Sequence, residues 1–158
     1  MNQNRQNIQA SILDRLIDRE PGVSHEPVQR RFLNFEQGKA SVIRDLENLL
    51  NTKSQILPVP PAYKEVNNSL YVYGLEDFTS ENPKSLAVRQ HLRQDIEKAI
   101  SLFEPRLTNV TVRVEAPMEK ERSVRFKISG LLILDPLTEP VNFDTYFDIN
   151  KGEYTIPK

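Results

Sequence analysis

At residues 103–115, FEPRLTNVTVRVE, the sequence pattern changes from that of a helix to that of a strand. Proline disfavours helical geometry at the residue before it, so a helix that leads into this stretch should end near Glu104. Beyond the proline, apolar and polar residues alternate with a period of two, which predicts a half-buried strand over 107–116. A helix that turns directly into such a strand is typical of an α+β domain.

Two later segments alternate in the same way. Residues 122–134 and 141–149 place apolar side chains two apart, and residues 152–156 could add a short strand. We therefore predict helices packed on a three- to four-stranded antiparallel sheet, with one face buried. If the two long strands pair across a turn at 135–140, even positions of the first and odd positions of the second are buried together.

This pairing has two specific consequences. It places Gly130 close to Phe147. On the exposed face it sets basic residues opposite acidic ones, and cross-strand charge pairs of this kind help to fix the register. The expected pairs join Arg125 and Lys127 to Asp144 and Asp148.

Upstream, apolar residues follow helical spacing. The longest pattern predicts a helix over 84–103 that begins at Asn82 and Pro83, a good N-cap and first-turn pair. A second helix is predicted over 41–53. Its N-cap is either Asn34 or Ser41, and Asn51 suits a left-handed C-cap.

The first 33 residues differ in pattern from the rest of the chain. An amphipathic helix over 7–19 ends at a Pro-Gly pair, and a proline- and arginine-rich connector follows. We predict an N-terminal helical arm and connector over 1–33, and an α+β domain over 34–158. Residues 52–82 show no sustained period, so we expect ordered extended chain and turns there.

Composition limits the classes of function. The 158 residues carry a net charge of -1, with no basic segment, which argues against nucleic-acid binding. The chain has no cysteine, which excludes disulfides and thiol chemistry. It shows neither a signal-peptide pattern nor a long apolar run. We therefore expect a cytoplasmic protein with no direct membrane insertion.

The sequence offers little for catalysis. His25 and His91 have no neighbours at metal-ligand spacing, and the chain contains no phosphate-binding or nucleophile motif. We expect no metal, no cofactor and no catalytic residue. A glycosidase pair of carboxylates stays open, because it depends on a separation and an apolar pocket that sequence does not give.

Glu104 and Arg106 are the charged residues with the clearest possible role. A glutamate at a helix C-terminus lies at the unfavourable end of the helix dipole, whereas an arginine there is favourable. The two could form a surface pair at the helix end, or they could meet a partner. As exposed residues, they should be replaceable with changes in stability of about 1 kcal/mol or less.

Several stretches resemble the TssE family of type VI secretion baseplate subunits, which are related to phage tail baseplate wedge proteins once labelled lysozyme-like. The strongest matches are SILDRLID at 11–18, RDLENLLNTK at 44–53 and FEPRL at 103–107. Weaker ones are YGLED at 73–77, ISGLL at 128–132 and FDTYFDI at 143–149. They follow the order of the family over nearly the whole chain.

The resemblance implies a structural component of a contractile injection machine. Such a subunit joins other baseplate wedge subunits and templates polymerisation of contractile sheath subunits, offering its sheet to sheath strands. Strands 107–116 and 141–149 are the expected sheath contacts. The implied wedge contacts are Glu104, Pro105 and Arg106, together with Asn51, Thr52 and Lys53; Lys53 stands where the family usually has arginine.

Two other classes of function stay open. The old family label suggests a peptidoglycan-degrading hydrolase, which would need a route out of the cytoplasm. An assembly chaperone or adaptor would be absent from the finished particle. The apolar stripe of the first helix is compatible with docking on another subunit or with packing on the chain's own core.

Overall fold

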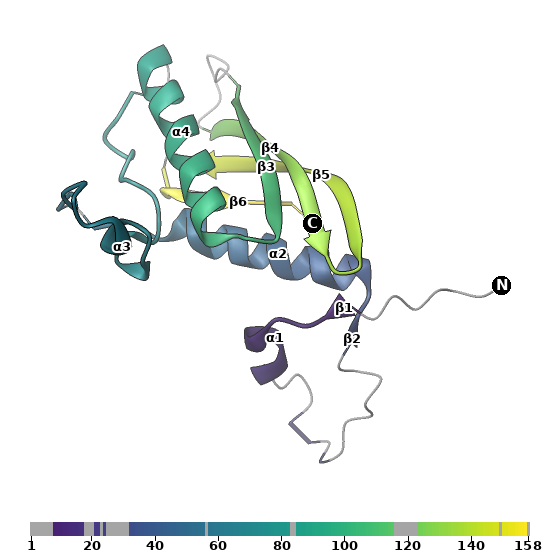
Figure 1. Ribbon diagram of the computed structural model, residues 1–158. Coiled ribbons are helices and arrows are strands. Elements are labelled where there is room, and N and C mark those ends of the chain that lie inside the picture. Colours follow the sequence, from purple (N-terminus) through teal and green to yellow (C-terminus); the bar gives the residue numbers. More distant parts are fainter. Residues whose placement is uncertain are drawn as a thin grey trace.

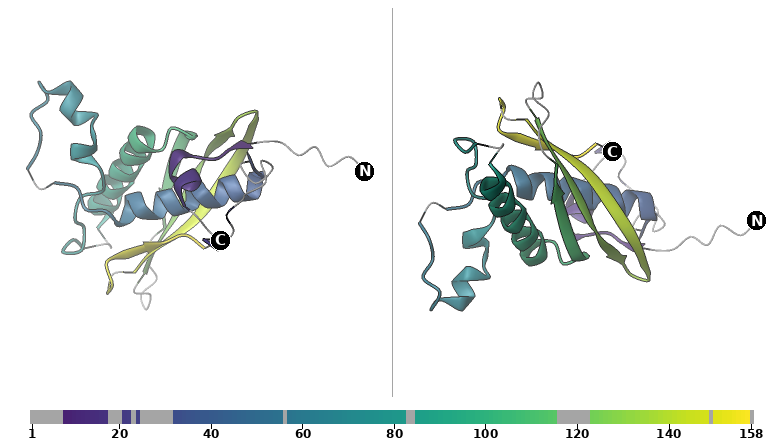
Figure 2. Two further views of the ribbon diagram at one scale, coloured as in Figure 1. Left: turned by 90° about the horizontal axis from the view of Figure 1, so that it is seen from below. Right: turned by 90° about the horizontal axis from the view of Figure 1, so that it is seen from above.

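The computed structural model describes residues 8–17, 21–22, 24, 32–55, 57–82, 85–115, 123–148 and 150–157. Four strands form an antiparallel meander, and two long helices cover one of its faces (Figures 1 and 2). The predicted α+β class is thereby confirmed. The elements of this unit are α2 (Phe35–Asn51), α4 (Leu86–Phe103), β3 (Leu107–Val114), β4 (Ser123–Leu134), β5 (Leu137–Asp148) and β6 (Glu153–Thr155).

The core lies between the sheet and the two long helices. Even positions of β4 and odd positions of β5 are buried, as the alternation predicts. Fully burying one such side chain contributes about 1.5–3 kcal/mol. The large side chains that are almost fully buried include Phe126, Ile128, Leu132, Leu46, Ile96 and Ile100.

The observed register corrects two of the expected neighbours. β4 and β5 turn tightly at Asp135 and Pro136, so Gly130 faces Val141 and Phe147 faces Val124. Gly130 instead lies against β3, where an added Cβ would come within 3.0 Å of a carbonyl oxygen. The close approach of the backbones therefore favours glycine at this position.

The predicted charge pairs are half right. Lys127 faces Asp144 across the β4–β5 ladder. Arg125 faces Tyr146 instead, with its guanidinium carbon 5.9 Å from the ring centroid. Asp148 is paired with Ser123. The tight turn pairs Leu134 with Leu137 directly across Asp135 and Pro136, and this determines every other partner along the two strands.

The structure decides between the two N-caps that the sequence offered for α2. α2 starts after Asn34, whose side chain accepts from the Gln37 amide at 2.8 Å while Gln37 Oε1 accepts from the Asn34 amide at 3.0 Å. This reciprocal capping box selects Asn34 over Ser41. Asn51 is the last helical residue, and its extended neighbour Thr52 is the C-cap, so the left-handed cap was wrong.

α4 begins two residues later than predicted. Its N-cap is Ser85, whose amide donates to the carbonyl of Asn82 at 3.0 Å, so Asn82 is not the cap. Pro83 lies outside the described residues, as does His25. The helix ends at Phe103 with Glu104 as its C-cap, as the proline rule predicts.

The N-terminal arm contains less helix than its apolar spacing suggests. α1 spans only Ile12–Leu16, between the short strand β1 (Ile8–Gln9) and an extended Ile17. β1 pairs with β2 (Phe32–Leu33), and Ile8 is buried in the core. The segment after α2, expected to be extended, also holds two short helices, α3 (Lys64–Asn67) and the 3-10 helix η2 (Leu70–Val72).

Candidate functional site

The turn between α4 and β3 is built around an ion pair. Arg106 Nε donates to Glu104 Oε1 at 2.7 Å, and Arg106 Nη2 donates to Glu104 Oε2 at 2.6 Å. Such a two-pronged contact is the strongest form of an arginine-carboxylate pair. It satisfies the Glu104 carboxylate, whose side chain is only 5% exposed, while Pro105 between the two lies at the surface.

Arg106 also joins this turn to α2. Its Nη2 donates to Asp45 Oδ2 at 2.6 Å and its Nη1 to Ser41 Oγ at 3.3 Å. Burial alone would lower the pKa of Arg106, but the hydrogen bonds and charges of Glu104 and Asp45 outweigh burial and raise it. The guanidinium therefore stays charged and fixes the turn against the middle of α2.

The same network reaches the N-terminal arm through Asp14. Asp14 Oδ1 accepts from Arg44 Nη1 at 2.6 Å, and Oδ2 accepts from Ser41 Oγ and Ser11 Oγ, each at 2.6 Å. Burial alone would raise the pKa of Asp14, but the hydrogen bonds of Arg44, Ser11 and Ser41 lower it to about 2. Asp14 is thus an ionised anchor that ties α1 to α2.

Asp45 links the two halves of the network. Its Oδ1 accepts from Arg44 Nε at 3.0 Å and Arg44 Nη2 at 2.8 Å, while its Oδ2 is bound to Arg106. Five charged side chains thereby connect the arm, α2 and the turn before β3. We call this set the ion network: Asp14, Arg44, Asp45, Glu104 and Arg106.

The geometry corrects the expectation that Glu104 and Arg106 are an exposed pair. Glu104 is buried, and four of the five N–H donors of Arg106 are directed at Glu104, Asp45 and Ser41. A residue so engaged is a poor candidate for replacement without loss of stability. Its role in partner binding remains a prediction, and the exposed part of the motif is Pro105.

The other predicted site residues lie at the end of α2. The Asn51 side chain bonds both backbone groups of Tyr154 in β6, at 2.9 and 2.7 Å. Thr52 Oγ1 donates to a carbonyl in its own helix, and Lys53 Nζ donates to Asp77 at 2.6 Å. Within the described residues, no hydrogen bond joins these three to the ion network.

Sequence reasoning missed Asp14, Ser41, Arg44 and Asp45 as individual site residues. A signal was available, because three of them lie in the stretches 11–18 and 44–53 that carry the family resemblance. Their spacing along α2 also puts Ser41, Arg44 and Asp45 on one helix face. Nothing in the sequence, however, shows that this face meets residue 106.

α1 docks by its polar side and leaves its apolar side exposed. Ile12 and Leu16 are each 76% exposed, and Leu13 and Ile17 are also exposed, while the Asp14 side chain is 5% exposed. We call these four apolar residues the α1 stripe. The sequence left two roles open for the apolar residues of the arm: for these four, packing on the chain's own core is wrong, whereas Ile8 does pack there.

The outer edge of β5 is a second unusual surface. β6 pairs only with the last three residues of β5, Tyr146 to Asp148. The N–H and C=O groups of Tyr154 are both bonded to Asn51 and therefore point away from β5. In an antiparallel pair the opposite residue does the same, so the N–H and C=O groups of Phe147 point away from β6. By this alternation, even residues of β5 present backbone groups at the outer edge, including Asn142 and Asp144.

Proline at position 140 agrees with this assignment, because proline is tolerated where the missing N–H would face outward from an edge strand. Beside this edge, a groove of about 350 Å³ runs between β5 and the first half of α2. Ala40 and Ile43 contribute its apolar floor on the helix side. An extended chain placed here would meet open backbone groups and an apolar surface together.

Helix side chains cap backbone groups at the other edges of the sheet. On β3, the Val112 amide donates to Glu97 Oε1 of α4 at 2.8 Å. Next to β6, the Ile156 amide donates to Glu47 Oε1 of α2 at 2.8 Å, and Asn51 covers Tyr154. Of the two strands expected to contact sheath, β5 therefore has the more open edge, and β3 the more protected one.

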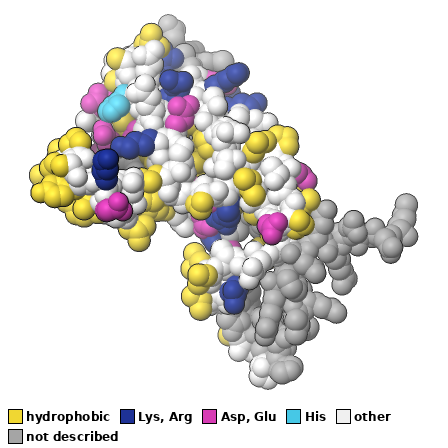
Figure 3. All heavy atoms as spheres, viewed as in Figure 1, with side chains coloured by type: hydrophobic (Ala, Val, Ile, Leu, Met, Phe, Trp, Pro, Cys, Tyr) yellow, Lys and Arg dark blue, Asp and Glu magenta, His cyan; other side chains and the backbone are white. Residues whose placement is uncertain are grey.

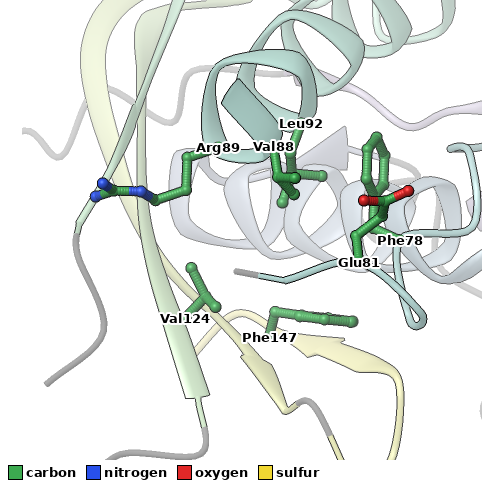
Figure 4. A pocket seen from close by; sticks show the side chains of 7 residues that line it. All are labelled: Phe78, Glu81, Val88, Arg89, Leu92, Val124 and Phe147. Atoms are coloured by element: carbon green, nitrogen blue, oxygen red, sulfur yellow. The ribbon is translucent and has the colours of Figure 1, made fainter. Parts of the chain in front are cut away.

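A small cavity also lies between α4, β4 and β5 (Figure 4). Its volume of about 20 Å³ is roughly that of one water molecule, and its walls are mainly apolar, with Val88, Leu92 and Phe147 among them. Arg89 points away from Glu81, so the two do not form a pair across it. Among the described residues, no group of three metal-binding side chains occurs.

Comparisons with known proteins identify the family. The family described as "Baseplate wedge protein gp25" matches residues 36–137, which is more than half of the chain. No curated protein matches at a significant level. A chain of the solved structure described as "The baseplate complex from the type VI secretion system" is similar, with 20% identity and a TM-score of 0.47, over 70% of this chain and 94% of that one.

The matched region contains α2, α4, β3 and β4, and with them four of the five members of the ion network. The description of the matching family gives no support to a peptidoglycan hydrolase. Within the described residues, no helix is long and apolar enough to cross a membrane. The chain belongs to the baseplate wedge protein gp25 family, and its role is that of a structural baseplate component.

Proposed function

We propose that this chain is a wedge subunit of a type VI secretion baseplate in the cytoplasm, where it joins other wedge subunits and templates polymerisation of the contractile sheath. Family membership supports the baseplate role. The sequence resemblance to the secretion branch favours that machine over a phage-derived particle. The single observation that carries the templating part is the open outer edge of β5 beside an apolar groove.

The α1 stripe is the proposed contact with wedge subunits. Four apolar side chains exposed together on one short helix and its end form a contiguous patch, and such patches mark surfaces that partners cover. The ion network gives the stripe a fixed orientation, because Asp14 is held by Arg44 and Ser41. Pro105 lies at the surface of the neighbouring turn, so stripe and turn can meet the same subunit.

The β5 edge is the proposed contact with sheath. A strand of a sheath subunit would pair with the open part of β5 and place alternate side chains over Ala40 and Ile43. The exposed side chain of Asp144 at this edge already faces Lys127 of β4, within the same chain. Backbone pairing, rather than a particular side chain, would therefore provide most of the affinity.

The test exploits the direction of the backbone groups. Asp144→Pro removes an outward N–H and leaves the β4–β5 ladder intact, whereas Asp144→Ala keeps that N–H and removes only the side chain. Both variants should fold, with unfolding free energies within about 2 kcal/mol of the wild type. On purified baseplates, sheath should polymerise from the alanine variant and fail to polymerise from the proline variant, as seen by electron microscopy.

Normal sheath growth from a folded proline variant would exclude strand addition at β5. Loss of growth in both variants would point to the Asp144 side chain instead of the backbone. If neither variant nor the wild type enters baseplates at all, the proposal of a wedge subunit is wrong.

A further inference from the structure

A lobe of the chain projects beside α4, away from both surfaces described above. Residues 57–72, which include α3 and η2, arch outward from the end of α2 (Figures 1 and 2). We call them the 57–72 lobe. Its surface is rich in apolar side chains, which form a broad patch at the side of the molecule (Figure 3). Leu57 and Leu70 are 73% and 79% exposed, and Tyr63 and Tyr71 are exposed as well.

A groove of about 680 Å³ separates this lobe from α4. We call it the α4 groove. Leu57, Val59 and Val72 line it on the lobe side, and Asp95, Ala99 and Leu102 line it on the helix side. The exposed apolar residues of the lobe continue beyond the hollow. The complete apolar surface is therefore larger than a small molecule needs, and it suits a macromolecular partner.

The walls of the groove favour a helix as the occupant. Asp95, Lys98, Ala99 and Leu102 follow one another at i, i+3, i+4 and i+7, which forms a ridge along α4 against which another helix can pack. A strand would need an open ladder. In the described part of 53–82, the strand-type pairing consists of one bridge, which joins Lys53 to Leu75 of the same chain. This wall of the groove therefore offers no strand with which a partner strand could pair.

Asp95 specifies the charge of the occupant. Its Oδ2 accepts from the Glu76 amide at 2.9 Å, yet among the described residues no Lys, Arg or His nitrogen lies within 4.0 Å of its carboxylate. Its neighbour Asp77, by contrast, is bound to Lys53 at 2.6 Å. Burial is the main cause that raises the pKa of Asp95, while the Glu76 amide and the charges of His91 and Lys98 act in the opposite direction. Neither His91 nor Lys98 forms an ion pair with the carboxylate, so its place for a direct cationic partner is open.

We propose that the α4 groove binds an amphipathic helix of another wedge subunit, with an apolar stripe against Leu57, Val59 and Leu102 and an Arg or Lys that pairs with Asp95. The proposal rests on the proposed function, because it draws the partner from the baseplate. It adds a contact on a different face from the α1 stripe and the β5 edge. A helix with an acidic residue at the corresponding position would be rejected, because two carboxylates would then share a partly buried site.

The first experiment locates the occupant. A photo-crosslinking amino acid is placed at Leu57, on the groove wall, or at Gln90, which is exposed on the opposite side of α4. Baseplates that contain each full-length variant are irradiated, and the joined peptides are identified by mass spectrometry. The expected product from position 57, and not from position 90, joins a helical segment with apolar residues at i, i+3 or i+4 and i+7 and a basic residue beside them.

The second experiment tests the charge. Asp95→Arg should reduce incorporation into baseplates at least tenfold, whereas Gln90→Arg should leave it unchanged. Changing the basic residue of the crosslinked segment to Asp should restore incorporation of Asp95→Arg. Leu57→Glu, at a highly exposed position that the fold does not need, should lower incorporation in the same way if Asp95→Arg proves to be unfolded by circular dichroism.

Each alternative outcome overturns the inference. The inference is wrong if folded Asp95→Arg and Gln90→Arg enter baseplates equally well. It is also wrong if position 57 crosslinks to an extended or acidic segment, or gives no crosslink in baseplates that contain the chain. These results leave the proposed function intact. Absence of the wild-type chain from purified baseplates would instead overturn the proposed function and this inference together.

Discussion

Glu104 and Arg106 bind each other across Pro105, with donor-acceptor distances of 2.7 and 2.6 Å. Because the motif lies at the point where α4 becomes β3, this pair closes the turn from within. Arg106 then extends to Asp45 on α2. The short stretch that looks like a surface motif in the sequence is therefore a clamp, and its effect on partner binding would act largely through the position of the surfaces around it.

Arg106→Ala should destabilise the fold. It leaves Glu104, with a side chain only 5% exposed, without its main counter-charge, and breaking a buried pair in this way costs about 3 kcal/mol. Chemical denaturation of the purified chain measures the loss. Arg113→Ala is the matched control, because Arg113 is an exposed arginine of β3 and its loss should change stability by about 0.5 kcal/mol or less.

Combining Arg106→Ala with Glu104→Gln should cost less than the sum of the two single changes, because the double variant leaves no unpaired charge in the turn. Strictly additive losses would contradict a direct clamp. A loss below about 1 kcal/mol for Arg106→Ala would support the surface-pair interpretation instead.

Low pH should release the N-terminal arm. The pKa of Asp14 is lowered from 3.8 to about 2 in the folded chain, so the folded state binds this proton less readily than the unfolded state. The stabilisation is complete above about pH 4 and is lost as the pH falls towards 2. After allowance for solvent screening it amounts to about 1 kcal/mol.

NMR methyl signals of Ile12 and Leu13 would follow this release. They should move towards random-coil positions below about pH 3, before the core signals change. In Asp14→Asn the arm signals should no longer shift with pH over this range. An arm transition above pH 5, or one that persists in Asp14→Asn, would show that another group holds the arm.

Asn51→Ala should loosen β6. The Asn51 side chain supplies two hydrogen bonds to Tyr154, and each typically contributes about 1 kcal/mol, so we expect a loss of about 1–2 kcal/mol. Faster amide exchange at 153–156 would locate the effect. Asn48→Ala, an exposed position of the same helix, should leave exchange in β6 unchanged; equal effects of both variants would exclude the proposed cap.

Phe147→Ala should be among the more destabilising single changes in the sheet. The ring is 6% exposed and lies 4.6 Å from the Tyr154 ring, so its removal should cost about 3–5 kcal/mol. Tyr146→Ala, the neighbouring residue on the exposed face, should cost much less. Similar losses for both, measured by denaturation, would contradict the buried face assigned to β5.

The fold could be predicted because its patterns are local. Alternation over β4 and β5 specifies which face is buried, and Pro105 specifies where α4 ends. The register was less accessible, because it depends on a two-residue turn at Asp135 that spacing alone does not distinguish from a longer loop. Local spacing also misled at Ile8, which fits the helical period of the arm but pairs in β1.

The candidate site was harder to predict because it is made by contacts distant in the sequence. Arg106 meets Asp45 across 61 positions, and Arg44 meets Asp14 across 30. Residue type and spacing marked Glu104 and Arg106, but whether they are buried depends on where α2 packs. The open β5 edge depends in turn on the shortness of β6, which no single residue encodes.

The most direct test of the account is affinity capture of this chain, tagged at its C-terminus, from cells that are making the machine, followed by mass spectrometry. A structural baseplate subunit should bring down large wedge subunits together with sheath protein. The Arg113→Ala variant should retain both. A chain in which Ile12 and Leu16, the two most exposed residues of the α1 stripe, are changed to Ser should lose the wedge subunits. Recovery of the wild-type chain alone from such cells would contradict the account.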